Sequence, residues 1–263
     1  MVNVIKREIK SNFKSLIIWG IVIIVFNIMF FIEYGSIAKS AENASYYDMM
    51  PNIVKVMMGF SKLPLASEGG YYACMFFWSS LIMYIFATLK GSDILMKEEK
   101  DKTADFLYTK PIKRSTVLTA KILVAIINIA VLVVLNLLVI KIAYIPQIEN
   151  KGLINDINIT MIGLFVSSII YLMAGIFLGT AIKNINKAQI YSVVFFLITY
   201  LGVIIIDMLE KEKLYFLSPF KYFNAVDILE KGIELKYILL SVGLIIALAI
   251  ASYIKQEKRN ITN

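Results

Sequence analysis

The amino-acid sequence predicts an all-α, polytopic membrane protein with six transmembrane helices. Of its 263 residues, 59% are hydrophobic and 17% are charged, whereas soluble domains are roughly 45 to 50% apolar and about 25% charged. The apolar residues gather in six runs, each close to the roughly 20 helical residues needed to cross a bilayer core. Charged residues lie mainly between these runs, so each run is expected to form one membrane-spanning helix.

No internal repeat or low-complexity linker divides the chain, so residues 1–263 are expected to form a single membrane domain. The third run is long and is therefore expected to tilt, or to begin and end in the interface, with Lys121 and Lys141 extending from its two ends toward the membrane surfaces. The predicted spans are residues 16–32, 71–89, 117–144, 159–182, 188–206 and 237–254.

The distribution of Lys and Arg predicts that both termini face the cytoplasm. The two terminal segments, together with the second and fourth loops, hold 16 of these residues, and the other three loops hold 9. The richer set is also the shorter in total length, and cytoplasmic segments carry the excess of positive charge in membrane proteins. This bias accounts for the net charge of +8 without a nucleic-acid partner.

A basic segment precedes the first span. A cleaved signal peptide is the competing interpretation, but the apolar run is longer and less uniform than the core of such a peptide, so we expect the span to be retained. Ile5, Ile9 and Phe13 recur every four residues among basic side chains. This pattern is typical of a basic amphipathic helix lying on the inner membrane surface; a charge cluster that only fixes topology is the alternative.

The sequence lacks the residues of most catalytic and cofactor sites. It has no His and one Cys, which excludes an intrachain disulfide, multi-cysteine metal sites and histidine acid–base catalysis. No phosphate-binding loop or dinucleotide fingerprint occurs, and no span carries the paired acidic residues of an intramembrane metal or proton site. We therefore expect no bound cofactor, and any ATP must be bound by another polypeptide.

Polar residues inside the spans are amides and hydroxyls. Asn27 lies in the first span, and Asn128 and Asn136 lie in the third. Amides in a membrane interior usually form interhelical hydrogen bonds, and lining a substrate pathway is the alternative.

Small residues form a ladder along the fourth span. Gly163, Ser167, Gly175 and Gly179 share one helix face, because their spacings are multiples of four residues. Such a face lets a second helix approach closely, so we expect a helix contact here, either within the chain or with a second chain.

The loop at residues 90–116 predicts a short helix displayed on the cytoplasmic face. Thr103 can cap this helix, and Pro111 ends it. Its charged start changes abruptly to apolar residues that include Phe106 and Leu107. The alternative, a solvated loop that serves only topology, would expose these apolar groups without purpose.

At these residues the chain resembles the permease subunits of ABC transporters of the ABC-2 exporter type. Their loop typically reads E-E-x-x-G-T, a small apolar helix, P-[IV]-x-R, and a Lys at the start of the third span; here Lys102 stands where Gly is usual. A proline-led apolar helix at residues 50–60 and an aromatic segment at residues 218–223 agree with the resemblance. The matching loop residues are Glu98, Glu99, Thr103, Leu107, Pro111, Ile112, Arg114 and Lys121.

The resemblance implies a coupling helix that fits a cleft in a separate ATP-hydrolysing subunit, in a complex of two permease chains and two ATPase chains. Phe106 and Leu107 are then the apolar anchors, and Glu98, Glu99 and Arg114 orient the helix. The resemblance also implies short outer helices near the exit, and we expect the amphipathic one to begin at Pro219. An interfacial aromatic belt is the alternative for this segment.

The sequence thus predicts a multi-pass permease subunit of an ABC exporter in a bacterial cytoplasmic membrane, in contact with membrane lipid, that catalyses no reaction itself. The expected cargo is amphiphilic or hydrophobic, such as a peptide, a drug or a lipid-like compound. The two permease chains form either a homodimer or a heterodimer. Two other classes stay open: a non-transporting membrane scaffold or sensor, and a lipid-modifying enzyme, which would need catalytic groups clustered at the interface.

Overall fold

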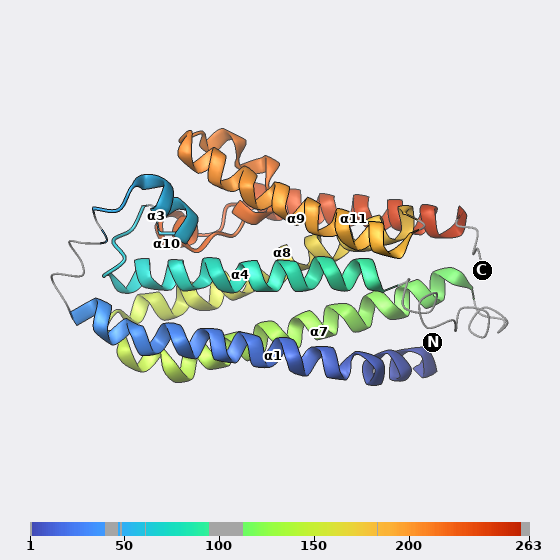
Figure 1. Ribbon diagram of the computed structural model, residues 1–263, viewed down its shortest axis with the longest axis horizontal. Helices are drawn as coiled ribbons and strands as arrows, with labels where there is room; N and C mark the ends of the chain where they lie inside the picture. The colour runs from blue at the N-terminus through green and yellow to red at the C-terminus, as the bar shows by residue number, and fades with distance from the viewer. Residues whose placement is uncertain are drawn as a thin grey trace.

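The computed structural model describes residues 2–39, 47, 49–60, 62–94, 113–182 and 184–258. Every regular element in these ranges is helical (Figure 1). Six helices are long and apolar enough to cross a membrane, which confirms the predicted all-α fold with six spans. They are α1 (Val2–Lys39), α4 (Glu68–Asp93), α7 (Arg114–Ala143), α8 (Lys151–Ala181), α9 (Ile185–Met208) and α11 (Leu235–Lys258).

Short helical segments connect the long helices. Figure 1 places α3 and α10 at the end of the bundle that lies away from the labelled chain ends. We call this end the opposite end, and the end where α1 begins and α11 finishes the termini end. The short elements are α3 (Asn52–Met58), η1 (Ile145–Gln147), η2 (Glu212–Leu217), η3 (Pro219–Lys221) and α10 (Ala225–Lys231).

The helix α1 is much longer than the apolar run that predicted it. Its 38 residues correspond to about 57 Å at 1.5 Å per residue, against a bilayer core about 30 Å thick. No Pro or Gly precedes Gly20, so nothing breaks the helix where the charged segment meets the span. The expectation of a separate helix lying on the membrane surface is therefore wrong, because the basic segment continues the spanning helix.

Local signals set the other helix ends. The side chains of Ser67, Asn150, Asn184 and Asn224 each accept a backbone N–H in the first turn of α4, α8, α9 and α10, respectively. Side chains of this kind favour helix starts because they satisfy an otherwise unpaired donor. The proline-led helix of the first outer loop is present as α3, which ends at Gly59 with a left-handed φ of 82°.

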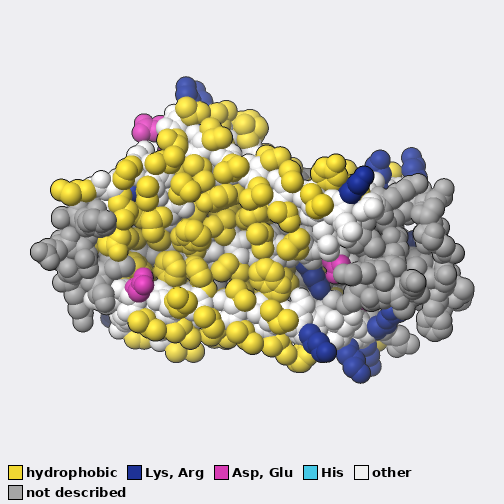
Figure 2. Space-filling view, in the orientation of Figure 1, with side chains coloured by type: hydrophobic (Ala, Val, Ile, Leu, Met, Phe, Trp, Pro, Cys, Tyr) yellow, Lys and Arg dark blue, Asp and Glu magenta, His cyan; other side chains and the backbone are white. Residues whose placement is uncertain are grey.

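The helices α4 and α8 form the centre of the bundle. They pack against each other more extensively than any other pair, while α1 packs on α7, α11 on α8, and α9 on α4. Most residues of α4 and α8 are buried, and α1, α9 and α11 leave apolar faces exposed. Figure 2 shows hydrophobic side chains across the middle of the molecule and Lys and Arg gathered mainly near the termini end.

Candidate functional site

The residues predicted to couple the chain to an ATPase lie between α4 and α7. Arg114 is the first residue of α7 and is partly buried. The end of α4 and the start of α7 both lie at the termini end of the bundle (Figure 1). The predicted residues Glu98, Glu99, Thr103, Phe106, Leu107 and Pro111 lie outside the described residues.

A buried lysine lies in α7, two turns after the helix begins. The Lys121 side chain is 1% exposed, and its Nζ donates a hydrogen bond to the Ile94 carbonyl at 2.6 Å. The same nitrogen lies 3.5 Å from Oε1 of the buried Glu8. Lys121 thus connects α7 with the end of α4 and with α1. The expectation that Lys121 extends to the membrane surface is wrong, because two acceptors compensate its charge inside the bundle.

Two further polar contacts lie beside Lys121. Lys90 Nζ donates to Asn12 Oδ1 at 2.6 Å, and Gln189 Nε2 donates to Asp93 Oδ1 at 3.5 Å. These four residues also line a pocket of about 410 Å³ between α1, α4 and α9. We call the whole group the termini-end polar cluster; it comprises Glu8, Asn12, Lys90, Asp93, Lys121 and Gln189.

The predicted ladder of small residues lies mainly against α4 of the same chain. A Cβ atom built on Gly175 would overlap the Thr88 carbonyl oxygen and would lie 3.1 Å from the Cα of Gly91. A Cβ atom on Gly179 would lie 2.8 Å from the Ser92 carbonyl oxygen. The two helices therefore cross where neither has a bulky side chain.

The other end of the ladder meets a loop residue. A Cβ atom on Gly163 would lie 2.5 Å from the Cβ of Phe223, so this glycine makes room for the segment between η3 and α10. Ser167 is buried between these two contacts.

The three predicted asparagines all face the interior of the bundle. Asn27 Nδ2 donates to the Ile23 carbonyl at 2.7 Å, one turn earlier on the same helix. The expected interhelical bond from this amide nitrogen is therefore wrong, because its own helix supplies the acceptor. The buried side-chain amide of Asn136 has no hydrogen-bond partner among the described residues.

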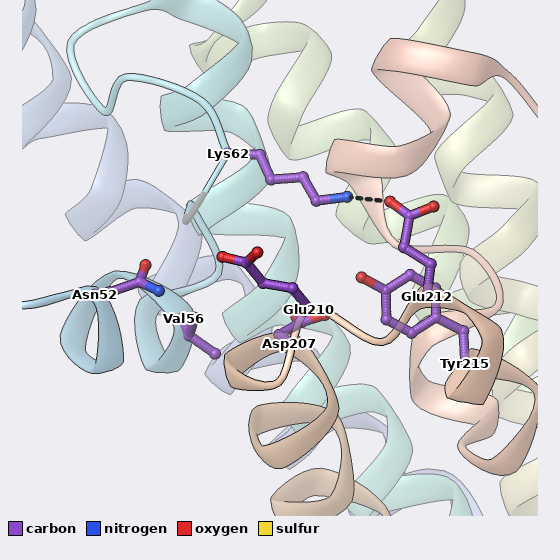
Figure 3. Close-up of a pocket in the computed structure, with 7 residues that line it drawn as sticks. All are labelled: Asn52, Val56, Lys62, Asp207, Glu210, Glu212 and Tyr215. Carbon is purple, nitrogen blue, oxygen red and sulfur yellow. Dashed lines mark hydrogen bonds and ion pairs between the residues drawn. The ribbon is translucent and has the colours of Figure 1, made fainter.

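Charged side chains from several elements meet at the opposite end. Lys62 points toward Glu212 in Figure 3, with 3.2 Å between Nζ and Oε1. Lys62 also lies 3.3 Å from Asp227 Oδ1, and Lys231 lies 3.2 Å from Glu212 Oε2. Hydrogen bonds from Lys62 and Lys231 hold the pKa of the Glu212 carboxyl below its ordinary value of 4.5.

A second buried lysine lies at the centre of this group. The Lys221 side chain is 2% exposed, and its Nζ lies 3.1 Å from Asp207 Oδ2 and 3.3 Å from Asp227 Oδ2. It also lies 4.7 Å from the centre of the Tyr215 ring, within the range of a cation–π contact. We call the group the opposite-end network; it comprises Lys62, Asp207, Glu212, Tyr215, Lys221, Asp227 and Lys231.

A pocket of about 330 Å³ opens beside this network, between α3 and the turn that follows α9. Glu210 forms that turn with a φ of 53°, and Figure 3 shows its carboxylate between Asn52 and Lys62. Across the part of the chain that the structure describes, no group of three or more Cys, Asp or Glu side chains could hold a metal ion.

The aromatic segment after α9 folds differently from the expectation. Pro219 begins the short η3 segment, whereas the amphipathic helix α10 begins at Ala225. The prediction placed this start too early because the Asn224 side chain, which accepts the Val226 N–H at 3.1 Å, caps α10 instead. Phe220 is buried. Sequence reasoning also missed Lys221, whose partners come from other elements.

These features define a polytopic, all-helical membrane protein with polar clusters at both ends of an apolar bundle. Residues 2–260 match the family described as ABC-2 family transporter protein. The chain therefore belongs to this family and is a permease, the membrane subunit of an ABC transporter.

A second comparison finds a partial relative. An uncharacterized protein of Mycoplasma pneumoniae (strain ATCC 29342 / M129 / Subtype 1) is 26% identical over 117 residues, which are 43% of this chain and 16% of that protein. The similarity thus covers a small part of that relative's length.

Proposed function

We propose that this chain is the permease of an ATP-driven exporter for an amphiphilic or hydrophobic compound in a bacterial cytoplasmic membrane. Two permease chains, of one kind or of two, work with separate ATPase subunits that bind the ATP. Both termini and the loop at residues 90–116 face the cytoplasm, in keeping with the excess of Lys and Arg on these segments. The coupling residues are Glu98, Glu99, Thr103, Phe106, Leu107, Pro111 and Arg114.

The buried Lys121 is the observation that carries this proposal. Its hydrogen bond to Ile94, the residue that ends α4, connects that helix to α7, and it pairs with Glu8 on α1. A force on the loop therefore acts on three helices together. A chain without a nucleotide site can be driven only through contact with a partner that favours one of its conformations, and this connection supplies a rigid route for that contact.

The composition of the bundle favours an apolar cargo. Its long helices carry apolar faces, and its ion pairs lie near its two ends. An enzyme that modifies lipids needs acid–base groups at the interface, but lysines engage the carboxylates of Asp207, Glu212 and Asp227 at the opposite end. A scaffold or sensor could use the same loops without any dependence on ATP, so nucleotide dependence separates it from the exporter.

The proposal is tested by transport into inside-out membrane vesicles that contain the permease and its co-purifying ATPase. We expect ATP-dependent accumulation of a hydrophobic fluorescent probe, abolished by a catalytically inactive ATPase. Association that is indifferent to ATP, with no accumulation of any probe in a panel of amphiphiles, would favour a scaffold or sensor.

Orientation needs a separate measurement. In a Cys74→Ala background, cysteine at the exposed position Glu230 at the opposite end should react with an impermeant thiol reagent in intact cells. Cysteine at the exposed position Lys258 at the termini end should react only after lysis. The reverse pattern would invert the proposed topology.

A further inference from the structure

The first turns of α1 direct their side chains to two opposite faces. Val4, Glu8 and Asn12 are buried, and Lys6, Lys10 and Lys14 are exposed. The two sets are offset by two residues, which is about 200° around an α-helix. Contacts of Glu8 with Lys121 and of Asn12 with Lys90 fix this rotation of the helix.

The outward face carries positive charge only. Arg7 is exposed beside the three lysines, and Glu8, the sole acidic residue before Glu33, is turned into the bundle. None of the four cations forms an ion pair with another described residue. The face therefore lacks a compensating anion within the described part of the chain.

Apolar side chains lie between these cations. Ile9 is 44% exposed and Phe13 is 57% exposed, and Ile17 continues the same face into the apolar run. From the rise of 1.5 Å per residue, Lys14 and Lys10 lie about 3 and 9 Å before Leu16, where that run begins, and the headgroup layer on each side of a bilayer is about 5 to 8 Å thick. Lys14 and Lys10 thus lie at the level of the lipid phosphates or close to it, whereas Lys6 and Arg7 lie about 15 and 14 Å before Leu16, beyond that layer.

We propose that this face of α1 binds anionic phospholipid from the leaflet at the termini end. The ammonium and guanidinium groups donate to the lipid phosphate in charge-assisted hydrogen bonds. Phe13, about 5 Å before Leu16, contacts the boundary between headgroups and acyl chains, as the apolar residues of basic interfacial helices do. The binding face comprises Lys10, Phe13 and Lys14, with Lys6, Arg7 and Ile9 farther from the bilayer. This proposal goes beyond the exporter function and requires neither ATP nor transport.

Spin-labelled lipids in vesicles test the proposal. The full-length permease is reconstituted in phosphatidylcholine with a trace of spin-labelled phosphatidylglycerol or, separately, of spin-labelled phosphatidylcholine. The fraction of label immobilised by the protein gives the preference for the anionic lipid. The variant is Lys10→Gln with Lys14→Gln, which removes the two cations nearest the lipid phosphates and keeps Lys6 and Arg7. The matched control, Lys255→Gln with Lys258→Gln, removes two exposed cations from the same end, where α11 also carries Glu257.

We expect the wild-type chain and the control to immobilise more spin-labelled phosphatidylglycerol than phosphatidylcholine. In the α1 variant, the ratio of the two should fall by up to about five-fold for each cation removed. High salt should weaken the wild-type preference, because surface charges are screened. An equal preference in the α1 variant and the wild type, or a preference that salt does not change, would overturn the proposal. Loss of the co-purifying ATPase in the α1 variant with an unchanged lipid preference would also overturn it, since the face would then bind protein.

Discussion

Lys121 and Lys221 each hold a positive charge inside an apolar bundle, and each is compensated by acceptors from other elements. The sequence shows Lys121 near the start of the third apolar run, where a lysine ordinarily extends to the membrane surface, and Lys221 in the middle of the loop between the fifth and sixth runs. Their burial could not be predicted, because it depends on Glu8 and Asp207, which only the packing of separate helices brings near. The position of Lys121 was thus predictable from the sequence, but its surroundings were not.

The substitution Lys121→Met should destabilise the permease. It leaves the Glu8 carboxylate buried without its cation, and the loss of one partner of a buried ion pair costs about 3 to 5 kcal/mol. We expect a lower midpoint of thermal unfolding for the purified protein, measured by circular dichroism. Lys187→Met is the control, because Lys187 is exposed on α9. Equal midpoints for the two variants would show that Lys121 does not secure the bundle.

The opposite-end network should respond to acid through Glu212. Lys62 and Lys231 lower the pKa of this carboxyl in the folded protein below 4.5, so its contribution to stability is present above 4.5 and is lost as the pH falls through the lowered value. The difference in unfolding midpoint between the wild type and Glu212→Gln should therefore shrink below pH 4.5. The effect is small because the Glu212 side chain is about half exposed and solvent screens its ion pairs. A difference that is the same at neutral and strongly acidic pH would contradict this assignment.

Among the elements, the crossing of α4 and α8 determines how the bundle is assembled. The ladder on α8 was visible in the sequence, since glycines four residues apart mark a face without bulk. The matching small residues of α4, Gly91 and Ser92, lie beyond its apolar run, so the sequence did not indicate that α4 was the partner. The starts of helices were easier to predict from the sequence, because residues such as Asn224 carry a side chain that can cap the helix.

Gly175→Ala should weaken this crossing. The added methyl group overlaps the backbone oxygen of Thr88, which cannot move like a flexible side chain, and overpacking of this kind costs about 1 to 3 kcal/mol. Gly243→Ala is the matched control on α11, where a Cβ atom meets nothing within 4 Å and alanine is the better helix former by up to about 1 kcal/mol. Thermal unfolding should give a lower midpoint for Gly175→Ala and an unchanged or higher one for Gly243→Ala. A Gly175→Ala midpoint at or above that of the control would show that the helices can separate at no cost.

For the whole molecule, the apolar runs predicted the six spans because a bilayer requires about 20 apolar residues in each helix. The order of packing around α4 and α8 could not be predicted, because most long helices are apolar on several faces. In the folded chain, the end of α4 and the start of α7, which flank the predicted coupling residues, contribute Lys90, Asp93 and Lys121 to the termini-end polar cluster. The central claim is therefore that the loop with these coupling residues transmits the action of an ATPase to α1, α4 and α7.

The most direct test uses a double variant that carries both Phe106→Ala and Leu107→Ala, and compares it with the single variant Lys100→Ala. Apolar anchors dominate most protein interfaces, whereas charges at the rim contribute little. We predict that the double variant inserts and purifies normally but neither retains nor stimulates the ATPase, and that Lys100→Ala behaves like the wild type. A double variant that binds the ATPase and exports at the wild-type rate would contradict the claim that this loop is the coupling element.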